Sequence, residues 1–137
     1  MASKTTLVDA NVLLDVLTED AQWATWSAEA LADAARDGEL LINPIIYAEV
    51  SVRFDSLDNL DAAIPATILR RESLPYDAAF LAGKAFVAYR RSGGSRTSPL
   101  PDFYIGAHAL VAGHALLTRD AARYRTYFPE LTVISPA

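Results

Sequence analysis

The sequence predicts an α/β fold of one domain, in which helices cover a mainly parallel sheet. Short β-suited runs alternate along the chain with longer segments whose apolar residues recur at helical spacing. Because crossover helices join parallel strands, this alternation favours a parallel sheet with helices on both faces. The length of 137 residues and the hydrophobic content of 52% suit one core of ordinary size. We therefore expect residues 1–137 to form a single domain.

Four runs are candidate strands of this sheet. Each is short and consists mainly of β-branched and other apolar residues. The runs are residues 5–8 (TTLV), 39–43 (ELLIN), 114–118 (HALLT) and 131–135 (LTVIS). We expect a central sheet of four to five short strands.

Helical patterns fill the intervals between these runs. The first strand passes directly into a helix that begins near Asn11, and Trp23 and Trp26 start the apolar face of the next helix. Asn43 followed by Pro44 is typical of an N-cap with proline in the first helical position. Further helices are predicted over residues 57–70, 76–91 and 101–112, and a mobile loop over 91–101.

Composition narrows the classes of function. The chain has no cysteine, which excludes disulfides and thiolate metal sites. No signal peptide is visible, and the longest uncharged run, residues 103–118, is shorter than the roughly 20 residues that span a bilayer. We expect a soluble cytoplasmic protein that does not enter membranes. Residues 1–69 hold 3 basic and 12 acidic side chains, a balance of −9, whereas residues 70–137 hold 9 and 5, a balance of +4.

Four acidic residues stand in apolar surroundings, where an ionised carboxylate is costly unless it is paired or bound to a metal. Asp9 ends the first strand, and Glu49 lies inside the apolar helix after Pro44. Asp102 opens the apolar helix at 101–112, and Asp120 follows the third strand. In parallel sheets ligands bind at the carboxyl ends of the strands. On such a sheet all four carboxylates can converge on one pocket.

Three of these acids also have an ordinary structural explanation. Asp9 and Asp120 can each cap a following helix, and Asp102 can lie in a first helical turn, where the helix dipole favours a negative charge. Glu49 is far from both ends of its helix and has no such explanation. The coincidence of four acids favours a functional site over four separate structural roles.

Four stretches, in this order along the chain, together carry a family resemblance. They are LVDANVLLDVL, NPIIYAEVSVRF, LPDFYIGAHALVAGHALLTRD and RYRTYFPELTVISP. The chain resembles the PIN-domain ribonucleases, and most closely the VapC-like toxins of bacterial toxin–antitoxin pairs. The resemblance implies a PIN-like three-layer α/β/α fold. Only residues 55–100 lack matching chemistry, since helices alone correspond there.

The resemblance also implies a reaction. Asp9, Glu49, Asp102 and Asp120 would be the catalytic acids and would bind one or two Mg²⁺ or Mn²⁺ ions, which prefer oxygen ligands. The ion would activate a water and polarise the scissile phosphate, so that an endoribonuclease hydrolyses RNA. Asn11 and Thr118 would position a carboxylate or the water. The implied partners are RNA, a cognate antitoxin protein and a second copy of the chain in a homodimer.

Other conspicuous residues favour ordinary roles. His108 and His114 are expected to be hydrogen-bonded core or surface histidines, because hard cations prefer oxygen to imidazole nitrogen. Trp23 and Trp26 are expected to pack a helix against the sheet, and Tyr104 and Tyr124 to pack in the core rather than to stack on bases. Arg90, Arg91 and Arg96 form a solvated charged face by default, with an RNA-backbone contact as the alternative.

Rival classes differ at particular positions. A phosphotransferase of the haloacid-dehalogenase type needs a second acid where this chain has Asn11, and a response-regulator receiver needs a lysine after a late strand, whereas the only lysines are Lys4 and Lys84. A PIN nuclease that processes RNA outside a toxin pair would keep the same acids. A PIN module that binds RNA or protein without cutting would be expected to lose some of them.

Overall fold

A five-stranded parallel sheet forms the centre of the fold in the computed structural model, which describes residues 4–97 and 100–136. The strands lie in the order β3-β2-β1-β4-β5. They are β1 (Lys4–Val8), β2 (Gly38–Ile42), β3 (Leu69–Arg71), β4 (Ala115–Leu117) and β5 (Val133–Ile134). The predicted α/β class with a parallel sheet is confirmed.

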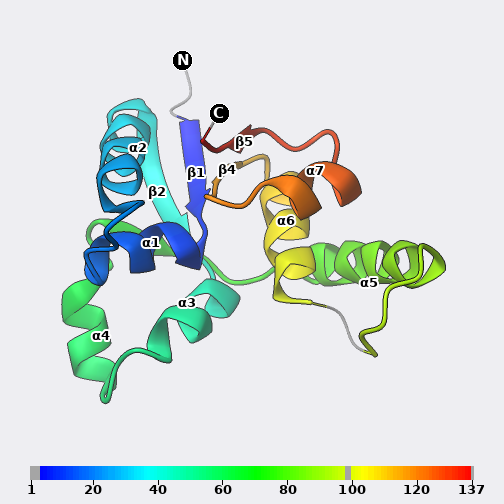
Figure 1. Cartoon of the computed structure of the whole chain (residues 1–137), viewed down its shortest axis with the longest axis horizontal. Coiled ribbons are helices and arrows are strands. Elements are labelled where there is room, and N and C mark those ends of the chain that lie inside the picture. Colours follow the sequence, from blue (N-terminus) through cyan, green and yellow to red (C-terminus); the bar gives the residue numbers. More distant parts are fainter. Residues whose placement is uncertain (1–3, 98–99, 137) are drawn as a thin grey trace.

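Helices cover both faces of this sheet. Figure 1 shows α1 and α2 to one side of β1, with α5 and α6 to the other, so the molecule has three layers. The helices are α1 (Ala10–Leu17), α2 (Ala24–Asp37), α3 (Pro44–Ser51), α4 (Leu57–Ala63), α5 (Tyr76–Arg91), α6 (Pro101–Ala112) and α7 (Ala122–Tyr127). Leu7 lies beside Leu41 and Leu116 in the sheet, and all three side chains are fully buried. Double coverage explains why the central parts of the inner strands, Leu7–Val8, Leu40–Ile42 and Leu116–Leu117, are continuous buried apolar runs.

The order of the strands creates a crevice. From β1 the chain moves outward through β2 to β3 and then returns to β4 on the other side of β1. Such a reversal opens a crevice at the carboxyl ends of the two inner strands. The backbone N–H of Asp9 donates to the carbonyl of Leu117 at 2.9 Å, so the chain segments that follow β1 and β4 leave the sheet side by side.

Several local predictions are confirmed. The helices at 76–91 and 101–112 have the predicted bounds. The Asn43 side chain caps α3 by accepting from the N–H of Ile46 at 2.9 Å, with Pro44 in the first turn. Helix α6 ends at Gly113, whose φ of 75° is in the left-handed region that glycine adopts without strain.

One prediction is wrong. Residues 57–70 are not a single helix, because α4 ends at Ala63 and Leu69 begins strand β3. Pro65 is the physical reason, since proline lacks an N–H and disfavours helical backbone in the residue before it. Its carbonyl accepts from the N–H groups of Ile68 and Leu69, which closes a turn before the strand.

The predicted loop at 91–101 overlaps the last residue of α5 and the first of α6, and its residues 98–99 lie outside the described part of the chain. Within the described part, the Arg90 guanidinium donates to the carbonyl of Arg96 at 2.7 Å. Of the helices described, none is both long and apolar enough to cross a membrane.

Candidate active site

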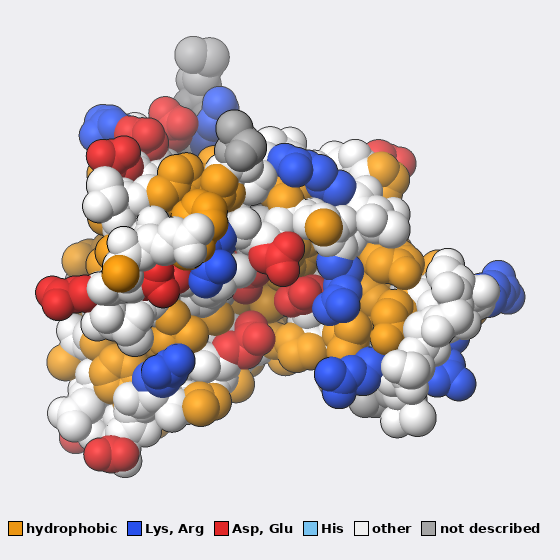
Figure 2. All heavy atoms as spheres, viewed as in Figure 1, with side chains coloured by type: hydrophobic (Ala, Val, Ile, Leu, Met, Phe, Trp, Pro, Cys, Tyr) orange, Lys and Arg blue, Asp and Glu red, His pale blue; other side chains and the backbone are white. Residues whose placement is uncertain are grey.

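The four predicted carboxylates line one cavity. Its volume is about 280 Å³, and it opens where β1 and β4 give way to helices. Its lining consists of Asp9, Ala10, Asn11, Leu14, Glu49, Asp102 and Asp120. Figure 2 shows acidic side chains gathered in the middle of the viewed face, with Lys and Arg side chains beside them. Four distant segments of the chain thus bring their acids to one place.

Asp9 is the most deeply buried of the four, with 5% of its surface exposed. It caps α1, since its Oδ1 accepts from the N–H of Ala10 at 2.8 Å. Its Oδ2 accepts from the Thr118 hydroxyl at 2.8 Å and from the Tyr124 hydroxyl at 2.9 Å. The capping role and the place in the cavity therefore coexist, and the carboxylate is held in one orientation.

Asn11 and Thr118 connect the start of α1 to the segment after β4. The Asn11 amide donates to the Thr118 hydroxyl oxygen at 3.3 Å and accepts from the N–H of Arg119 at 3.1 Å. The N–H of Asp120 also points at the Thr118 hydroxyl oxygen, at 3.2 Å. This network fixes Asp9 and Asp120 relative to each other.

Glu49 lies in the last turn of α3, which ends at Ser51, so the expectation that it is far from both ends of its helix is wrong. One oxygen of its carboxylate is unsatisfied. Its Oε1 is buried and has no hydrogen-bond partner among the described residues. Burial, and then the charges of Asp9 and Asp102, raise the pKa of Glu49 from 4.5 to about 7. A buried, unpaired carboxylate oxygen is costly to the fold unless a ligand completes it.

Asp102 and Asp120 lie nearer the surface. Asp102 is in the first turn of α6, where its Oδ1 accepts from the Tyr124 hydroxyl at 3.2 Å and its Oδ2 from Arg123 at 3.3 Å. Asp120 is exposed, and α7 begins after Ala121 as its N-cap. The alternative in which Asp120 caps α7 is therefore wrong.

The donor set fits a hard divalent cation. The polar side chains that line the cavity are four carboxylates and the Asn11 amide, and hard cations such as Mg²⁺ and Mn²⁺ prefer oxygen. Burial also raises the pKa of Asp9, opposed by the hydrogen bonds of Thr118 and Tyr124. A cation would relieve both the desolvation and the mutual repulsion of Asp9, Glu49 and Asp102.

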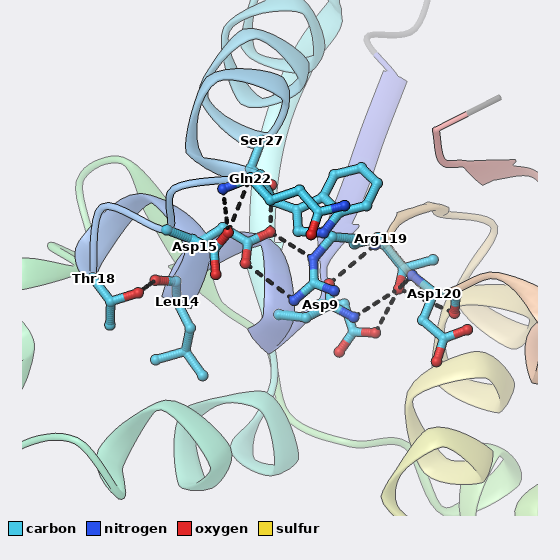
Figure 3. Close-up of polar contacts among 12 residues, drawn as sticks. Asp9, Leu14, Asp15, Thr18, Gln22, Ser27, Arg119 and Asp120 are labelled. Carbon is cyan, nitrogen blue, oxygen red and sulfur yellow. Dashed lines mark hydrogen bonds and ion pairs between the residues drawn. The ribbon is translucent and has the colours of Figure 1, made fainter.

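Sequence reasoning missed three residues around this cavity. Tyr124, expected only to pack in the core, reaches two of the carboxylates. Asp15 is 3% exposed and pairs with Arg119, whose Nε lies 2.8 Å from Asp15 Oδ2. Figure 3 shows Arg119 extended toward Asp15 while Asp120 points the other way. An acid inside the apolar run NVLLDVL was the available signal for Asp15.

A second polar cluster consists of His108 in α6, His114 just after α6 and Glu72 just after β3. Glu72 Oε1 accepts from His108 Nε2 at 2.9 Å and from His114 Nε2 at 2.6 Å. His108 Nδ1 faces the Asn43 amide nitrogen at 3.0 Å, and that amide is oriented by its capping bond to Ile46. His108 Nδ1 must therefore accept a hydrogen bond, which keeps the proton on Nε2.

This arrangement has consequences for metal binding. If a metal bound His108 Nε2, the ring proton would have to move to Nδ1. There it would face the N–H of Asn43, so two hydrogen-bond donors would oppose each other. The hydrogen bonds from His114 and His108 outweigh burial and lower the pKa of Glu72, as expected for a carboxylate held by two imidazole donors. The two histidines are hydrogen-bonded core residues, as the sequence predicts.

Comparison with known proteins identifies relatives of the fold. The family model of the PIN domain matches residues 6–129. The VapBC2 complex of Rickettsia felis, bound to a promoter DNA fragment, contains a chain that is 15% identical, with coverage of 97% of this chain and 99% of that one and a TM-score of 0.71. VapBC-1 of nontypeable Haemophilus influenzae gives 14% identity, coverage of 96% and 97%, and a TM-score of 0.72.

A toxin–antitoxin complex from Klebsiella pneumoniae is also similar, at 21% identity, 96% and 98% coverage and a TM-score of 0.67. No curated protein matches the sequence. At these identities the likeness to solved structures concerns the fold. The family match rests on the sequence itself and covers most of the chain.

Proposed function

The chain belongs to the PIN-domain family, and from that premise we propose that it is a metal-dependent endoribonuclease acting on RNA phosphodiester bonds. One observation carries the proposal: four carboxylates from four segments surround one cavity, and a buried oxygen of Glu49 has no partner among the described residues. We further propose that residues 1–137 act as one domain and that the enzyme works in the cytoplasm.

Each side chain of the site has a role in this proposal. Asp9, Glu49, Asp102 and Asp120 would hold Mg²⁺ or Mn²⁺. When bound, such a cation polarises the scissile phosphate and increases the acidity of water. Asn11 and Thr118 hold Asp9 and Asp120 in a fixed relative position through the hydrogen bonds that join α1 to the segment after β4.

RNA fits the distribution of charge around the cavity. Arg123 reaches Asp102 at the rim, with 43% of its side chain exposed. Figure 2 shows further Lys and Arg side chains beside the acidic centre, where they can bind the phosphates that flank the cleaved bond. The acids at the centre would repel the same phosphates unless a cation neutralised them.

The biological role that we propose is that of a toxin whose partner is an antitoxin protein. The similar solved structures include toxin–antitoxin complexes. Residues 1–69 carry a balance of −9, which would steer a basic antitoxin segment toward this half. We also propose a homodimer. Sedimentation of the isolated protein tests it, and a monomer at high micromolar concentration would contradict it.

RNA cleavage by the purified protein tests the enzyme itself. Single-stranded RNA should be cut with Mg²⁺ or Mn²⁺ and left intact in EDTA. Asp9→Asn should abolish cleavage with an unchanged circular dichroism spectrum, whereas Asp33→Asn on the exposed face of α2 should cut like wild type. Undiminished cleavage by Asp9→Asn would remove that residue from the mechanism. RNA that the wild type binds but does not cut would favour a binding module.

A further inference from the structure

We propose that Tyr124 is a positioning residue of the metal site, holding Asp9 and Asp102 in the orientation that binds the cation. The inference rests on the proposed function and extends it to a residue of α7 that is not one of the four carboxylates. Tyr124 is 1% exposed, so its ring packs in the core while its hydroxyl reaches the cavity wall.

The contacts of the hydroxyl carry the inference. It lies 2.9 Å from Asp9 Oδ2 and 3.2 Å from Asp102 Oδ1. A phenol has one proton, so it can donate fully to only one of these two carboxylates at a time. Since Asp9 caps α1 directly after β1 and Asp102 is in the first turn of α6, the hydroxyl connects two different elements of the cavity wall.

The orientation of Asp9 depends on this bridge. Its Oδ1 is fixed by the N–H of Ala10, and its Oδ2 by the hydroxyls of Thr118 and Tyr124. Groups that hydrogen-bond to a metal-binding carboxylate fix its orientation, and their loss typically costs about ten- to a hundredfold in metal affinity. Tyr124 has this relation to Asp9 and also touches Asp102.

A glycine in α6 makes the bridge possible. A Cβ on Gly106 would lie 2.6 Å from Phe128 Cδ2 and 3.0 Å from Tyr124 Cδ1. Only a residue without a side chain lets the aromatic rings of this segment approach α6 so closely. This close approach places the Tyr124 hydroxyl within hydrogen-bond distance of Asp102, which lies four residues before Gly106 on the same helix.

The competing explanation is that Tyr124 merely fills the core. The two explanations differ in what the hydroxyl does, because removal of one oxygen leaves the ring and its packing in place. Tyr127 offers a matched control on the same helix, since its ring packs against Phe103 and Tyr89 in the core. Tyr124→Phe and Tyr127→Phe are therefore the same chemical change at two positions.

The decisive measurement is the affinity of the purified protein for Mn²⁺, determined from the electron paramagnetic resonance signal of free Mn²⁺. RNA cleavage is measured on the same proteins. Tyr124→Phe should raise the Kd for Mn²⁺ at least tenfold, and higher Mn²⁺ should restore much of its cleavage. Tyr127→Phe should match wild type in both. A purely structural role would lower the melting temperature of Tyr124→Phe and leave its Kd for Mn²⁺ unchanged.

The outcomes separate the two proposals. Equal Mn²⁺ affinities in wild type and Tyr124→Phe, with RNA cleavage by the wild type, would overturn the role of Tyr124 alone. A wild type that binds no Mn²⁺ would overturn both proposals. Should Tyr124→Phe fail to fold, Gly106→Ala takes its place, since its Cβ would press on the Phe128 ring and reach Tyr124 Cδ1 at 3.0 Å. It keeps the phenol but should shift it away from the carboxylates and raise the same Kd.

Discussion

Asp15 and Arg119, 104 positions apart in the sequence, form an ion pair in which the carboxylate is buried and the guanidinium is partly exposed. The Arg119 Nε donates to Asp15 Oδ2 at 2.8 Å and its Nη2 to Oδ1 at 3.1 Å, while the Ser27 hydroxyl donates to the same Oδ2 at 2.8 Å (Figure 3). The guanidinium also lies over the Trp23 ring, 5.4 Å from its centroid. The pair ties α1 and α2 to the segment that carries Thr118 and Asp120.

Asp15→Asn should lower the free energy of unfolding by about 1–3 kcal/mol, because the buried carboxylate accepts hydrogen bonds from Arg119 and Ser27. The remaining Arg119 charge loses its partner but stays partly hydrated, since 31% of its side chain is exposed. Urea unfolding in EDTA measures the loss. Asp33→Asn is the matched control, because the Asp33–Arg36 pair is about 70% exposed and should contribute less than about 0.5 kcal/mol. Equal losses in the two variants would contradict a special role for the Asp15–Arg119 pair.

Mg²⁺ should raise the melting temperature of the wild type. A ligand that binds only the folded state stabilises it by RT ln(1 + [M]/Kd), about 2.7 kcal/mol at a hundredfold excess over Kd. Asp102→Asn should melt at or above wild type in EDTA, because it removes one of the repelling charges, and should gain less from Mg²⁺. Thermal melts of both proteins with and without Mg²⁺ give the four melting temperatures to compare. Identical Mg²⁺ shifts would show that Asp102 is not a ligand.

Ionisation of Glu49 should destabilise the metal-free protein as the pH rises. Burial and the neighbouring acids raise the pKa of Glu49 from 4.5 to about 7, so between these values the folded state binds a proton more tightly than the unfolded state. The stabilising effect of that proton is complete below pH 4.5 and is lost as the pH rises through 7. Relative to Glu49→Gln, the wild type should therefore lose up to about 3 kcal/mol over this range.

Urea unfolding of both proteins in EDTA, at half-unit steps of pH, measures this difference and cancels the other titrating groups. Saturating Mg²⁺ should abolish it, since the cation then compensates the charge of Glu49. A difference that does not change between pH 4.5 and 8 would mean that Glu49 ionises as freely as in the unfolded chain.

Gly106→Ala should destabilise the fold, whereas Gly83→Ala should stabilise it. A Cβ at Gly106 would be 2.6 Å from the Phe128 ring, and such overpacking costs about 1–3 kcal/mol. A Cβ at Gly83, in the middle of α5, has open space around it, and alanine is there favoured over glycine by roughly 0.5–1 kcal/mol. Thermal melts of the two variants should shift in opposite directions. A stabilised Gly106→Ala would show that α6 and α7 do not need the close contact.

Local pattern is sufficient to predict most of the elements and to mark the four acids that line the cavity. Hydrophobic periodicity locates α5 and α6, and an acid within an apolar run marks Glu49. Strand β3 is missed because Leu69–Arg71 is only three residues long and alternates too briefly to show a period. Its place at the edge of the sheet comes from pairing with β2, which no local pattern records.

The supporting residues of the site are harder to predict for a different reason. Tyr124 and Arg119 act through partners more than 100 residues away in the sequence, Asp9 and Asp15. A tyrosine in an amphipathic helix is ordinarily a core residue, and its ring here is one. Only the distance of its hydroxyl from two carboxylates, fixed by packing at Gly106, separates the two roles.

The strand order has a consequence for the protein while it is being synthesised. The middle strand of the sheet, β1, is made before the other strands, but its neighbour β4 and the segment with Thr118 and Asp120 follow more than 100 residues later. Until then Asp9 lacks the Thr118 and Tyr124 hydroxyls and the cavity lacks one of its walls. A nascent chain therefore cannot assemble the complete site until the segments that carry Thr118, Asp120 and Tyr124 have been made and have folded against β1.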